Sequence, residues 1–401
     1  MVPKLAPVNL ASPDFKPNAY AIYARLRAEE PVHRTALEDG RVLWLVTRYD
    51  DCVAALKDER LVKDWRPLGI DLYGPDEARM QLDRHMLNTD PPTHTRLRAI
   101  VNKAFTPKLV EGLRDRIQAI ADDLLDQVQG RGEMDLVADY AFPLPIIVIA
   151  ELLGVPVADR HRIRTWSDAV VGGVPTRERV DRAAGLIKEF KDYLLGMVEE
   201  RRKAPREDLL SALVHVEEEG AGKLDETELL SMVFLLLIAG HETTVNLIAN
   251  GMLALLTHPA ERERLRADPS LLRSAIEELL RYDSPVETAT FRFAREDVEL
   301  GGAVIPKGDA VVVVLGSANR DPALTPSPES LDLAREPNRH IAFGLGIHYC
   351  LGAPLARLEG QIAIGTILRR MPNLALKVPP ESIEIRPSLL VRGPASLPVS
   401  F

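Results

Sequence analysis

Cys350 ends a glycine-rich loop, Phe343-Gly-Leu-Gly-Ile-His-Tyr-Cys350, which runs into the amphipathic segment APLARLEGQIAIGTILRR. The thiol is therefore expected near the N-terminus of a helix, where the macrodipole and free backbone N–H groups favour a thiolate. A thiolate is the form of cysteine that ligates a metal. Because a lone cysteine is more often a small buried apolar residue, the surroundings of Cys350 have to decide between the two interpretations.

A second candidate site lies in the apolar run over residues 225–258, which Pro259 ends. Its first four residues, Asp-Glu-Thr-Glu, are close to a capping box, and the run is apolar on nearly every face, which predicts a buried central helix. Glu242 and Thr243 stand inside it. A buried carboxylate is costly unless it is paired or hydrated, so Glu242 indicates function. Thr243 alone could simply bond to the carbonyl four residues earlier.

The ten residues 343–352 follow the pattern Phe-Gly-x-Gly-x-His-x-Cys-x-Gly. In this pattern the chain resembles the cytochrome P450 family of haem-thiolate monooxygenases. Residues 239–244, Ala-Gly-His-Glu-Thr-Thr, are similar to the oxygen-activation motif of that family. Glu278 and Arg281 match its Glu-x-x-Arg motif, and Arg335 matches the arginine that completes a triad with them.

The resemblance covers nearly the whole chain, and Ala318-Asn-Arg-Asp-Pro322 also matches a segment of the family. Leu331 is a departure, since the family commonly has Phe there, and it concerns only local packing. The resemblance implies haem b as the cofactor, with the Cys350 thiolate as its iron ligand. It also implies that Glu242 and Thr243 carry protons to bound oxygen through ordered water.

Further residues acquire roles from the same resemblance. Glu278, Arg281 and Arg335 would form a buried structural element, whereas a similar pair at the surface would contribute well under 1 kcal/mol. Cationic side chains would pair with the two haem propionates, and we expect His94, Arg98, Arg292 and His348 in that role. The complete set of expected haem contacts is His94, Arg98, Ala239, Gly240, Arg292, Phe343, Gly344, His348 and Gly352.

The elements that must position these residues are mainly helical. Apolar residues at spacings of three and four predict helices over most of residues 92–285 and 352–370. Short β-rich runs broken by Gly and Pro predict strands within about 31–47, 286–315 and 374–401. The sequence therefore predicts one domain over residues 1–401, mainly α with a minor β-rich lobe. By the resemblance, this is the cytochrome P450 fold, with the long buried helix over the haem.

Three local features complete the predicted organisation. Asp39-Gly40 lies between two β-rich runs and predicts a tight hairpin turn. Residues 65–88 and 171–177 interrupt the helical pattern with Gly, Pro and mixed polarity, so we expect loops that could cover a pocket.

Composition excludes several classes of protein. With 50 Lys and Arg against 59 Asp and Glu, the net charge is −9, which argues against nucleic acid as a partner. The longest unbroken apolar stretch, residues 232–240, is about half of the roughly 20 residues that cross a bilayer, so no membrane span is expected. The N-terminus lacks an apolar signal region, which favours the cytoplasm. Cys52 and Cys350 are too few for a disulfide framework.

The partners follow from the resemblance as well. No residues remain for a flavin or reductase domain, so a separate ferredoxin with its NAD(P)H-dependent reductase would deliver two electrons to a monomeric enzyme. Such donors are usually acidic, so we expect a basic patch on the Cys350 face. Its candidates are Arg96, Lys103, Lys108, Arg339 and Arg357.

The substrate is expected to be an apolar organic compound that is hydroxylated or epoxidised with O₂. A polyketide or macrolide, a terpenoid or a steroid would fit by family analogy. By position relative to the motifs, the pocket could be lined by Leu235, Ile238, Ala239, Thr243, Val286, Thr288, Ala289, Thr290, Leu390 and Val391, together with parts of residues 65–88.

Two alternatives stay open. A haem-binding sensor would need Cys350 and the propionate partners, and Glu242 and Thr243 argue against it. A haem-thiolate enzyme with non-hydroxylating or peroxide-driven chemistry is excluded by no residue. A zinc protease is excluded, because His241-Glu242 begins a His-Glu-x-x-His motif whose fifth position is Val245. A dinucleotide loop is excluded by Tyr349, which replaces the third glycine.

Overall fold

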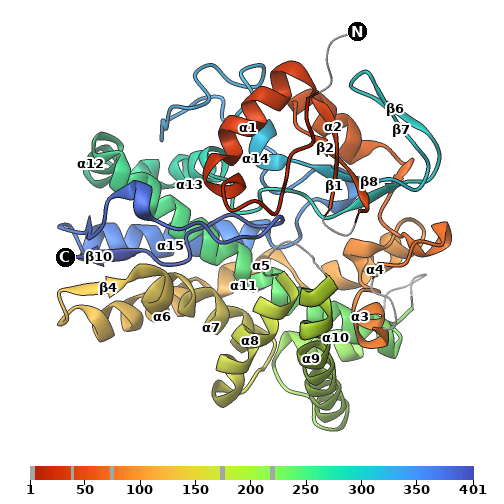
Figure 1. The fold of residues 1–401 in the computed structure, drawn as a ribbon. Helices are drawn as coiled ribbons and strands as arrows, with labels where there is room; N and C mark the ends of the chain where they lie inside the picture. Colours follow the sequence, from red (N-terminus) through yellow and green to blue (C-terminus); the bar gives the residue numbers. More distant parts are fainter. Residues whose placement is uncertain (1–4, 38–39, 73–75, 172–176, 217–221) are drawn as a thin grey trace.

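The computed structural model describes residues 5–37, 40–72, 76–171, 177–216 and 222–401. In Figure 1, a β-rich part with α1, α2 and α14 lies above, a group of helices lies below, and α11 runs between the two. This arrangement confirms the predicted fold class.

The α-helices of the described residues are α1 (Phe15–Glu29), α2 (Tyr49–Lys57), α3 (Glu77–Leu82), α4 (Thr93–Ala104), α5 (Pro107–Gly112), α6 (Arg114–Val128), α7 (Pro143–Leu152), α8 (Arg160–Val171), α9 (Arg177–Lys203), α10 (Leu209–His215), α11 (Glu226–Thr257), α12 (Pro259–Ala267), α13 (Leu272–Tyr282), α14 (Leu315–Ala318) and α15 (Ala353–Arg370).

The described strands form three small sheets. A five-stranded sheet has the order β1-β2-β8-β5-β3, a second has the order β4-β10-β9, and β6 pairs with β7. In the first sheet β2 and β8 are parallel and the other neighbours are antiparallel. The strands are β1 (Val32–Ala36), β2 (Val42–Val46), β3 (Leu61–Val62), β4 (Glu133–Asp135), β5 (Arg292–Ala294), β6 (Val298–Leu300), β7 (Ala303–Ile305), β8 (Ala310–Val313), β9 (Ala375–Leu376) and β10 (Pro398–Ser400).

α11 is the central helix that the apolar run predicts. Asp225 and Glu228 form a capping box at its start, and most of its side chains are buried. Gly251 lets α15 pack closely against it, because a Cβ there would come within 2.8 Å of Ile364 Cδ1 and would make that side chain shift. By length and hydropathy α11 could cross a membrane, but 78% of its most apolar window is buried inside the protein. It therefore packs as a core helix.

The structure corrects several of the predicted boundaries. Residues 65–88 are not all loop, since they contain α3, whose first turn is capped by the Asp76 carboxylate. β4 lies inside the segment predicted to be helical, where it pairs with β10. α1 and α2 were not predicted. β1 and β2 confirm the hairpin, although Asp39 of its turn lies outside the described residues. Residues 172–176 of the second predicted loop lie outside them as well.

Candidate functional site

The Cys350 loop is closed by its own backbone. Gly344 and Gly346 have φ angles of 70° and 76°, a conformation that favours glycine. The Cys350 N–H donates to the Phe343 carbonyl at 3.0 Å, which brings the two ends of the loop together just before α15. Burial raises the pKa of the Cys350 thiol, and the backbone N–H group of Gly352 opposes this shift. A bound metal cation would convert the thiol to a thiolate.

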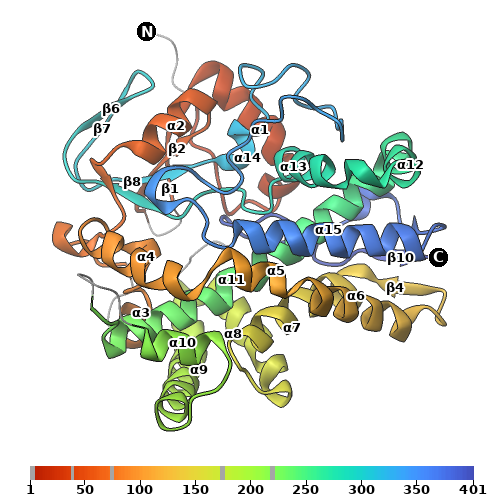
Figure 2. The same cartoon turned by 180° about the vertical axis from the view of Figure 1, so that it is seen from behind.

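The four expected propionate partners, His94, Arg98, Arg292 and His348, lie near this loop. Figure 2 shows α4, which carries His94 and Arg98, on the same side of the molecule as α15. The rings of His94 and His348 are 4.4 Å apart between centroids. Both nitrogens of His94 and Nε2 of His348 are buried and find no hydrogen-bond partner among the described residues. Arg98 donates to the Tyr349 carbonyl at 3.0 Å.

Arg292 is buried in β5, and its guanidinium donates to the carbonyls of Leu61 at 3.0 Å and Leu56 at 3.3 Å. It forms no ion pair with any carboxylate of the described chain. Burial lowers its pKa to about 10. Burial also lowers the pKa of His348 to about 2, and the charges of Lys63, Arg292, His94 and Arg98 add to that effect.

Lys63 is a member of this cluster that the sequence did not indicate. It is 2% exposed, and its Nζ donates to Thr290 Oγ1 at 2.6 Å and to the Phe291 carbonyl at 2.5 Å. Burial and the neighbouring Arg292 hold its pKa well below the ordinary value. Cations buried together without a paired carboxylate favour an anionic ligand. The two carboxylates of a haem fit this cluster in charge and in hydrogen-bonding capacity.

The expected oxygen-activation residues lie in the middle of α11. Ala239 is exposed although most residues around it in the helix are buried. A Cβ on Gly240 would come within 2.8 Å of Ile149 Cγ1, so glycine lets α7 pack closely here. The Thr243 hydroxyl donates to the Ala239 carbonyl at 3.0 Å and keeps its oxygen lone pairs available. This stretch of α11 therefore offers open surface and a hydroxyl oxygen to a bound molecule.

Glu242 is 2% exposed and is paired. Its Oε2 accepts from Arg386 Nη1 at 3.0 Å, and His241 Nε2 lies 3.5 Å from its Oε1. Arg386 also contacts Asp168 of α8 at 3.0 Å. Burial raises the pKa of Glu242, but His241 and Arg386 outweigh burial and lower it to about 2. Glu242 is thus held as a carboxylate by a partner that no local sequence pattern indicates.

The expected pocket residues divide into two groups. Ile238 is 7% exposed, and partly exposed side chains belong to Leu235, Val286, Ala289, Thr290 and Leu390. Thr288 and Val391 are only 2% and 1% exposed. The Thr288 hydroxyl donates to the Leu389 carbonyl at 3.0 Å, and Val391 forms a β-bridge with Val286. These two side chains are almost fully buried, and their assignment as lining residues stays a prediction.

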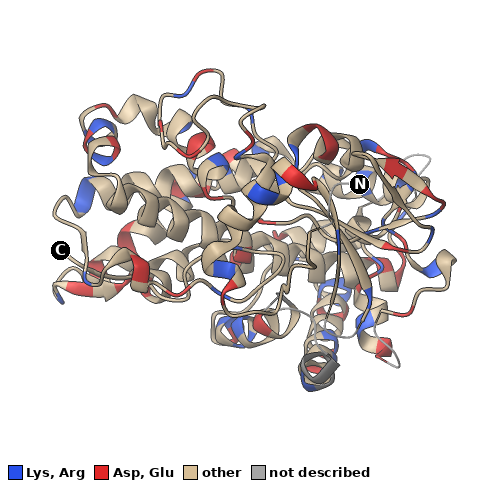
Figure 3. Cartoon of the chain, turned by 45° about the horizontal axis from the view of Figure 1, so that its top comes forward, with Lys and Arg blue, Asp and Glu red and all other residues tan. Residues whose placement is uncertain are grey.

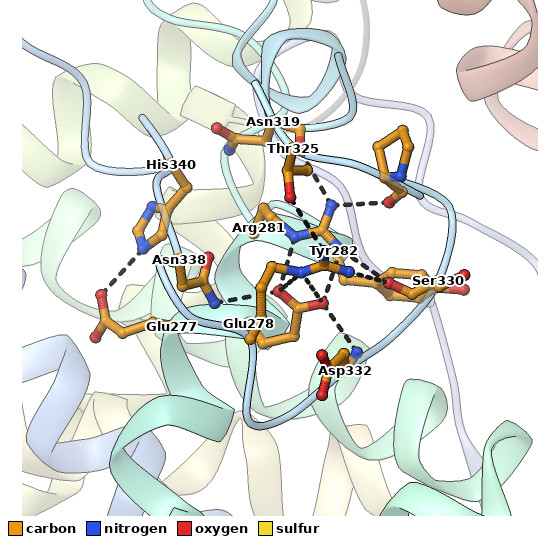
Figure 4. Close-up of polar contacts among 12 residues, drawn as sticks. Glu277, Glu278, Arg281, Tyr282, Asn319, Thr325, Ser330, Asp332, Asn338 and His340 are labelled. Atoms are coloured by element: carbon orange, nitrogen blue, oxygen red, sulfur yellow. Dashed lines mark hydrogen bonds and ion pairs between the residues drawn. The ribbon is translucent and has the colours of Figure 1, made fainter. Parts of the chain in front are cut away.

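The structural triad is buried as expected, and Figure 4 shows two of its members, Glu278 and Arg281, within a polar network. Glu278 and Arg281 are both 0% exposed and are joined by two hydrogen bonds of 2.7 and 2.8 Å. Arg335 donates to both Glu278 oxygens at 3.1 Å. Arg281 also donates to the carbonyls of Asn319 and Pro328 at 3.1 and 2.8 Å. The triad thus attaches the segment that precedes the Cys350 loop to α13.

The expected basic patch is more mixed than the sequence suggests. Arg96 pairs with Glu228, and Arg357 pairs with Glu277 at 2.7 Å. Lys103, Lys108 and Arg339 are exposed. In the view of Figure 3, acidic and basic residues are interspersed over the outer helices and loops. Apolar surface accompanies them on the Cys350 loop, where Ile347 and Tyr349 are 52% and 40% exposed.

Comparisons with known proteins show the family of the chain. The sequence profile of the family described as Cytochrome P450 matches residues 174–399. The chain is 46% identical to the polyketide biosynthesis cytochrome P450 PksS of Bacillus subtilis (strain 168), over 97% of each chain. It is 48% identical to the cytochrome P450 monooxygenase PikC of Streptomyces venezuelae, over 97% of this chain and 92% of that protein.

Solved structures give the same result for the fold. The myxobacterial cytochrome P450 CYP267B1, in complex with myristic acid, superposes with a TM-score of 0.92 at 51% identity and covers 98% of both chains. The tirandamycin C-bound P450 monooxygenase TamI superposes with a TM-score of 0.89 at 43% identity, over 97% of this chain and 98% of that one.

Proposed function

Since the chain belongs to the cytochrome P450 family, we propose that it is a haem-thiolate monooxygenase that inserts one atom of O₂ into an apolar organic substrate. The observation that carries the proposal is the pairing of two features in one loop. Cys350 lies just before α15, and His348, two residues earlier, lies near the buried side chains of Lys63 and Arg292, which form no ion pair with a carboxylate of the described residues. Binding a haem requires a ligand for its iron, here a thiolate, and cationic or hydrogen-bonding side chains for its two propionates.

We propose haem b as the cofactor, held in one domain that spans the chain. When bound, it supplies the oxidising chemistry, in which one oxygen atom of O₂ enters the substrate and the other leaves as water. Cys350 would ligate its iron, and Phe343, Gly344 and Gly352 would surround that ligand. The propionates would be held by His94, Arg98, Arg292, His348 and Lys63. The exposed Ala239 would leave room for it beside α11, whereas Gly240 admits Ile149 of α7.

Protons have to reach the oxygen side of the site. The Thr243 oxygen can accept a hydrogen bond from water while its own proton is donated to the Ala239 carbonyl. Glu242 is held ionised by Arg386, so it can accept a proton from solvent only when that ion pair opens. We propose that Thr243 positions the water next to the reacting oxygen and that Glu242 connects this water to the outside.

The substrate class and the electron donor are proposals by relationship. Relatives are named for polyketide biosynthesis and as a 6-deoxyerythronolide B hydroxylase, and we propose a polyketide or macrolide substrate, ahead of a terpenoid or a steroid. We propose that a ferredoxin and its NAD(P)H-dependent reductase supply electrons in the cytoplasm to the monomer. The exposed Lys108, Arg339, Ile347 and Tyr349 would suit an acidic, partly apolar donor surface.

The test is spectroscopic first and catalytic second. The reduced carbon monoxide complex should show the red-shifted Soret band of a thiolate-ligated haem, and Cys350→His should lose it while Cys52→Ala keeps it. A compound library is then screened for the Soret shift that accompanies substrate entry, and hits are incubated with ferredoxin, reductase and NAD(P)H. Turnover with peroxide alone would favour peroxide-driven chemistry. Haem binding with no turnover under either condition would favour a sensor.

A further inference from the structure

A polar and aromatic cluster lies beside the Cys350 loop, and the function proposed above gives no role to the ion pair at its centre, between Glu277 and Arg357. It joins Glu277 of α13 to Arg357 of α15 and to the loop itself. The cluster borders a cavity of about 310 Å³ whose walls include Glu277, His340, Phe343, Tyr349 and Arg357. Glu277 precedes Glu278 of the structural triad, and Figure 4 shows its contact with His340.

The geometry fixes the Arg357 guanidinium in one orientation. Its Nε and Nη2 donate to the two oxygens of Glu277 at 2.7 and 2.8 Å, a bidentate pair. The guanidinium carbon lies over the Phe343 ring, 4.5 Å from the centroid, in a cation–π contact. Nη1 reaches the Tyr349 hydroxyl at 3.3 Å. His340 holds Glu277 from another side, with Nε2 3.0 Å from Oε2.

This orientation places a cation on the side chain of Phe343, the first residue of the Cys350 loop. The Phe343 carbonyl accepts the Cys350 N–H at 3.0 Å, so the stacked ring belongs to the residue that bonds the ligand. Glu277 of α13 binds the Arg357 guanidinium, and its negative charge acts on Cys350 mainly by offsetting the positive charge of Arg357.

Both members of the pair are ionised at neutral pH. Burial raises the pKa of Glu277, but Arg357 and His340 outweigh it and lower this pKa to about 2. The side chains of Glu277 and Arg357 are 28% and 30% exposed, so solvent screens this ion pair only in part. The bidentate pair joins α13 to α15, and the stacking of the guanidinium on Phe343 also directs this cation towards the Cys350 loop.

We propose that Arg357, oriented by Glu277, tunes the reduction potential of the iron bound at Cys350. The inference rests on the proposed function, because it requires a haem at this thiolate. Reduction adds one electron to the iron and its ligands, and a nearby cation stabilises the added charge. Arg357 therefore favours the reduced state and Glu277 restrains that effect. The two are positioning residues, since they act through the ligand loop and touch no substrate.

The test is a spectroelectrochemical titration of the substrate-free, haem-loaded protein. Arg357→Gln should lower the equilibrium constant for reduction, by up to about tenfold or about 59 mV for one electron. Glu277→Gln should raise it, because the cation loses its counter-charge. The double variant should lie close to the parent. Arg369→Gln is the matched control, since Arg369 lies at the far end of α15, where it pairs with Asp122 at 3.6 Å.

Opposite shifts in the two single variants support the proposal, because a purely structural role would move both in the same direction or neither. Shifts of the same sign, or shifts no larger than that of Arg369→Gln, would overturn it. If Arg357→Gln fails to hold haem, Arg357→Lys replaces it. Arg357→Lys keeps the charge but loses the bidentate contact, so its reduction potential should lie between that of the parent and that expected for Arg357→Gln. Reduction potentials equal to that of the parent in both Arg357→Lys and Glu277→Gln would reject the proposal. A parent that lacks the thiolate spectrum rejects the proposed function instead.

Discussion

Arg386 Nη1 lies 3.0 Å from Oε2 of Glu242, and this contact joins the C-terminal part of the chain to the middle of α11. The same guanidinium contacts Asp168 near the end of α8, so one side chain connects three elements. Glu242 is almost fully buried, and its charge is stable there because Arg386 and His241 compensate for the loss of water. A residue proposed for proton transfer is therefore also an anchor of the fold.

Arg386→Gln should destabilise the protein by about 1–3 kcal/mol, because it strands a buried carboxylate. The double variant with Glu242→Gln should recover most of the loss. The pKa of Glu242 in the folded state is about 2 against an ordinary 4.5, so the ion pair contributes fully above about pH 4.5 and its contribution is lost as the pH falls towards 2. Urea unfolding at several pH values should show the deficit of Arg386→Gln narrowing in that window. A constant deficit would contradict this account.

Thr243→Ala should uncouple the reaction. The hydroxyl oxygen is the group that can hold water beside the site, and its removal leaves Cys350 and the cation cluster untouched. We expect similar haem content, continued consumption of NAD(P)H and O₂, more hydrogen peroxide and less product. The measured quantity is product per NAD(P)H consumed, with peroxide assayed in parallel. Thr243→Ser keeps a hydroxyl and is the control that should stay coupled. Parental coupling in Thr243→Ala would remove Thr243 from the proton path.

How much the sequence could predict depended on the range of the interactions. α11, the β1–β2 hairpin and the Cys350 loop follow from residues a few positions apart, such as the capping pair Asp225 and Glu228. α3 was missed because a helix of six residues carries too little periodicity. Arg386 and Lys63 were missed for another reason. Their partners Glu242 and Thr290 are 144 and 227 positions away, and only the folded chain brings them together.

Glu278→Ala and Arg335→Ala should each leave the protein poorly folded and low in haem. Removing one member of a buried ion pair strands its partner at a cost of about 3–5 kcal/mol, a large share of total stability. Arg202→Ala is a suitable control, since Arg202 and Glu226 are 42% and 64% exposed, and this pair should contribute at most about 1 kcal/mol. Melting temperature and haem absorbance per protein provide the comparison. Equal effects in the triad and control variants would show that the triad is no stronger than a surface pair.

Lys63→Met should weaken haem retention while preserving the Cys350 ligation. Lys63 brings a buried ammonium to the cluster of His94, Arg292 and His348, and a propionate would offer it the carboxylate that the described chain does not place within ion-pair distance. One charge-assisted hydrogen bond of about 1.5 kcal/mol corresponds to roughly tenfold faster transfer of haem to a scavenger protein. Lys63→Arg retains the cation and should stay close to the parent.

A second variant separates the charge of Lys63 from its hydrogen bonds within the protein. Its Nζ donates to Thr290 Oγ1 and to the Phe291 carbonyl, so loss of these bonds alone could also loosen the site. Thr290→Val removes the hydroxyl acceptor and keeps the charge. If Lys63 acts through its cation, Lys63→Met releases haem faster and Thr290→Val does not, because only the first variant removes the charge. If both variants release haem equally fast, the hydrogen bonds to Thr290 and Phe291 account for the effect, and Lys63 is no propionate partner.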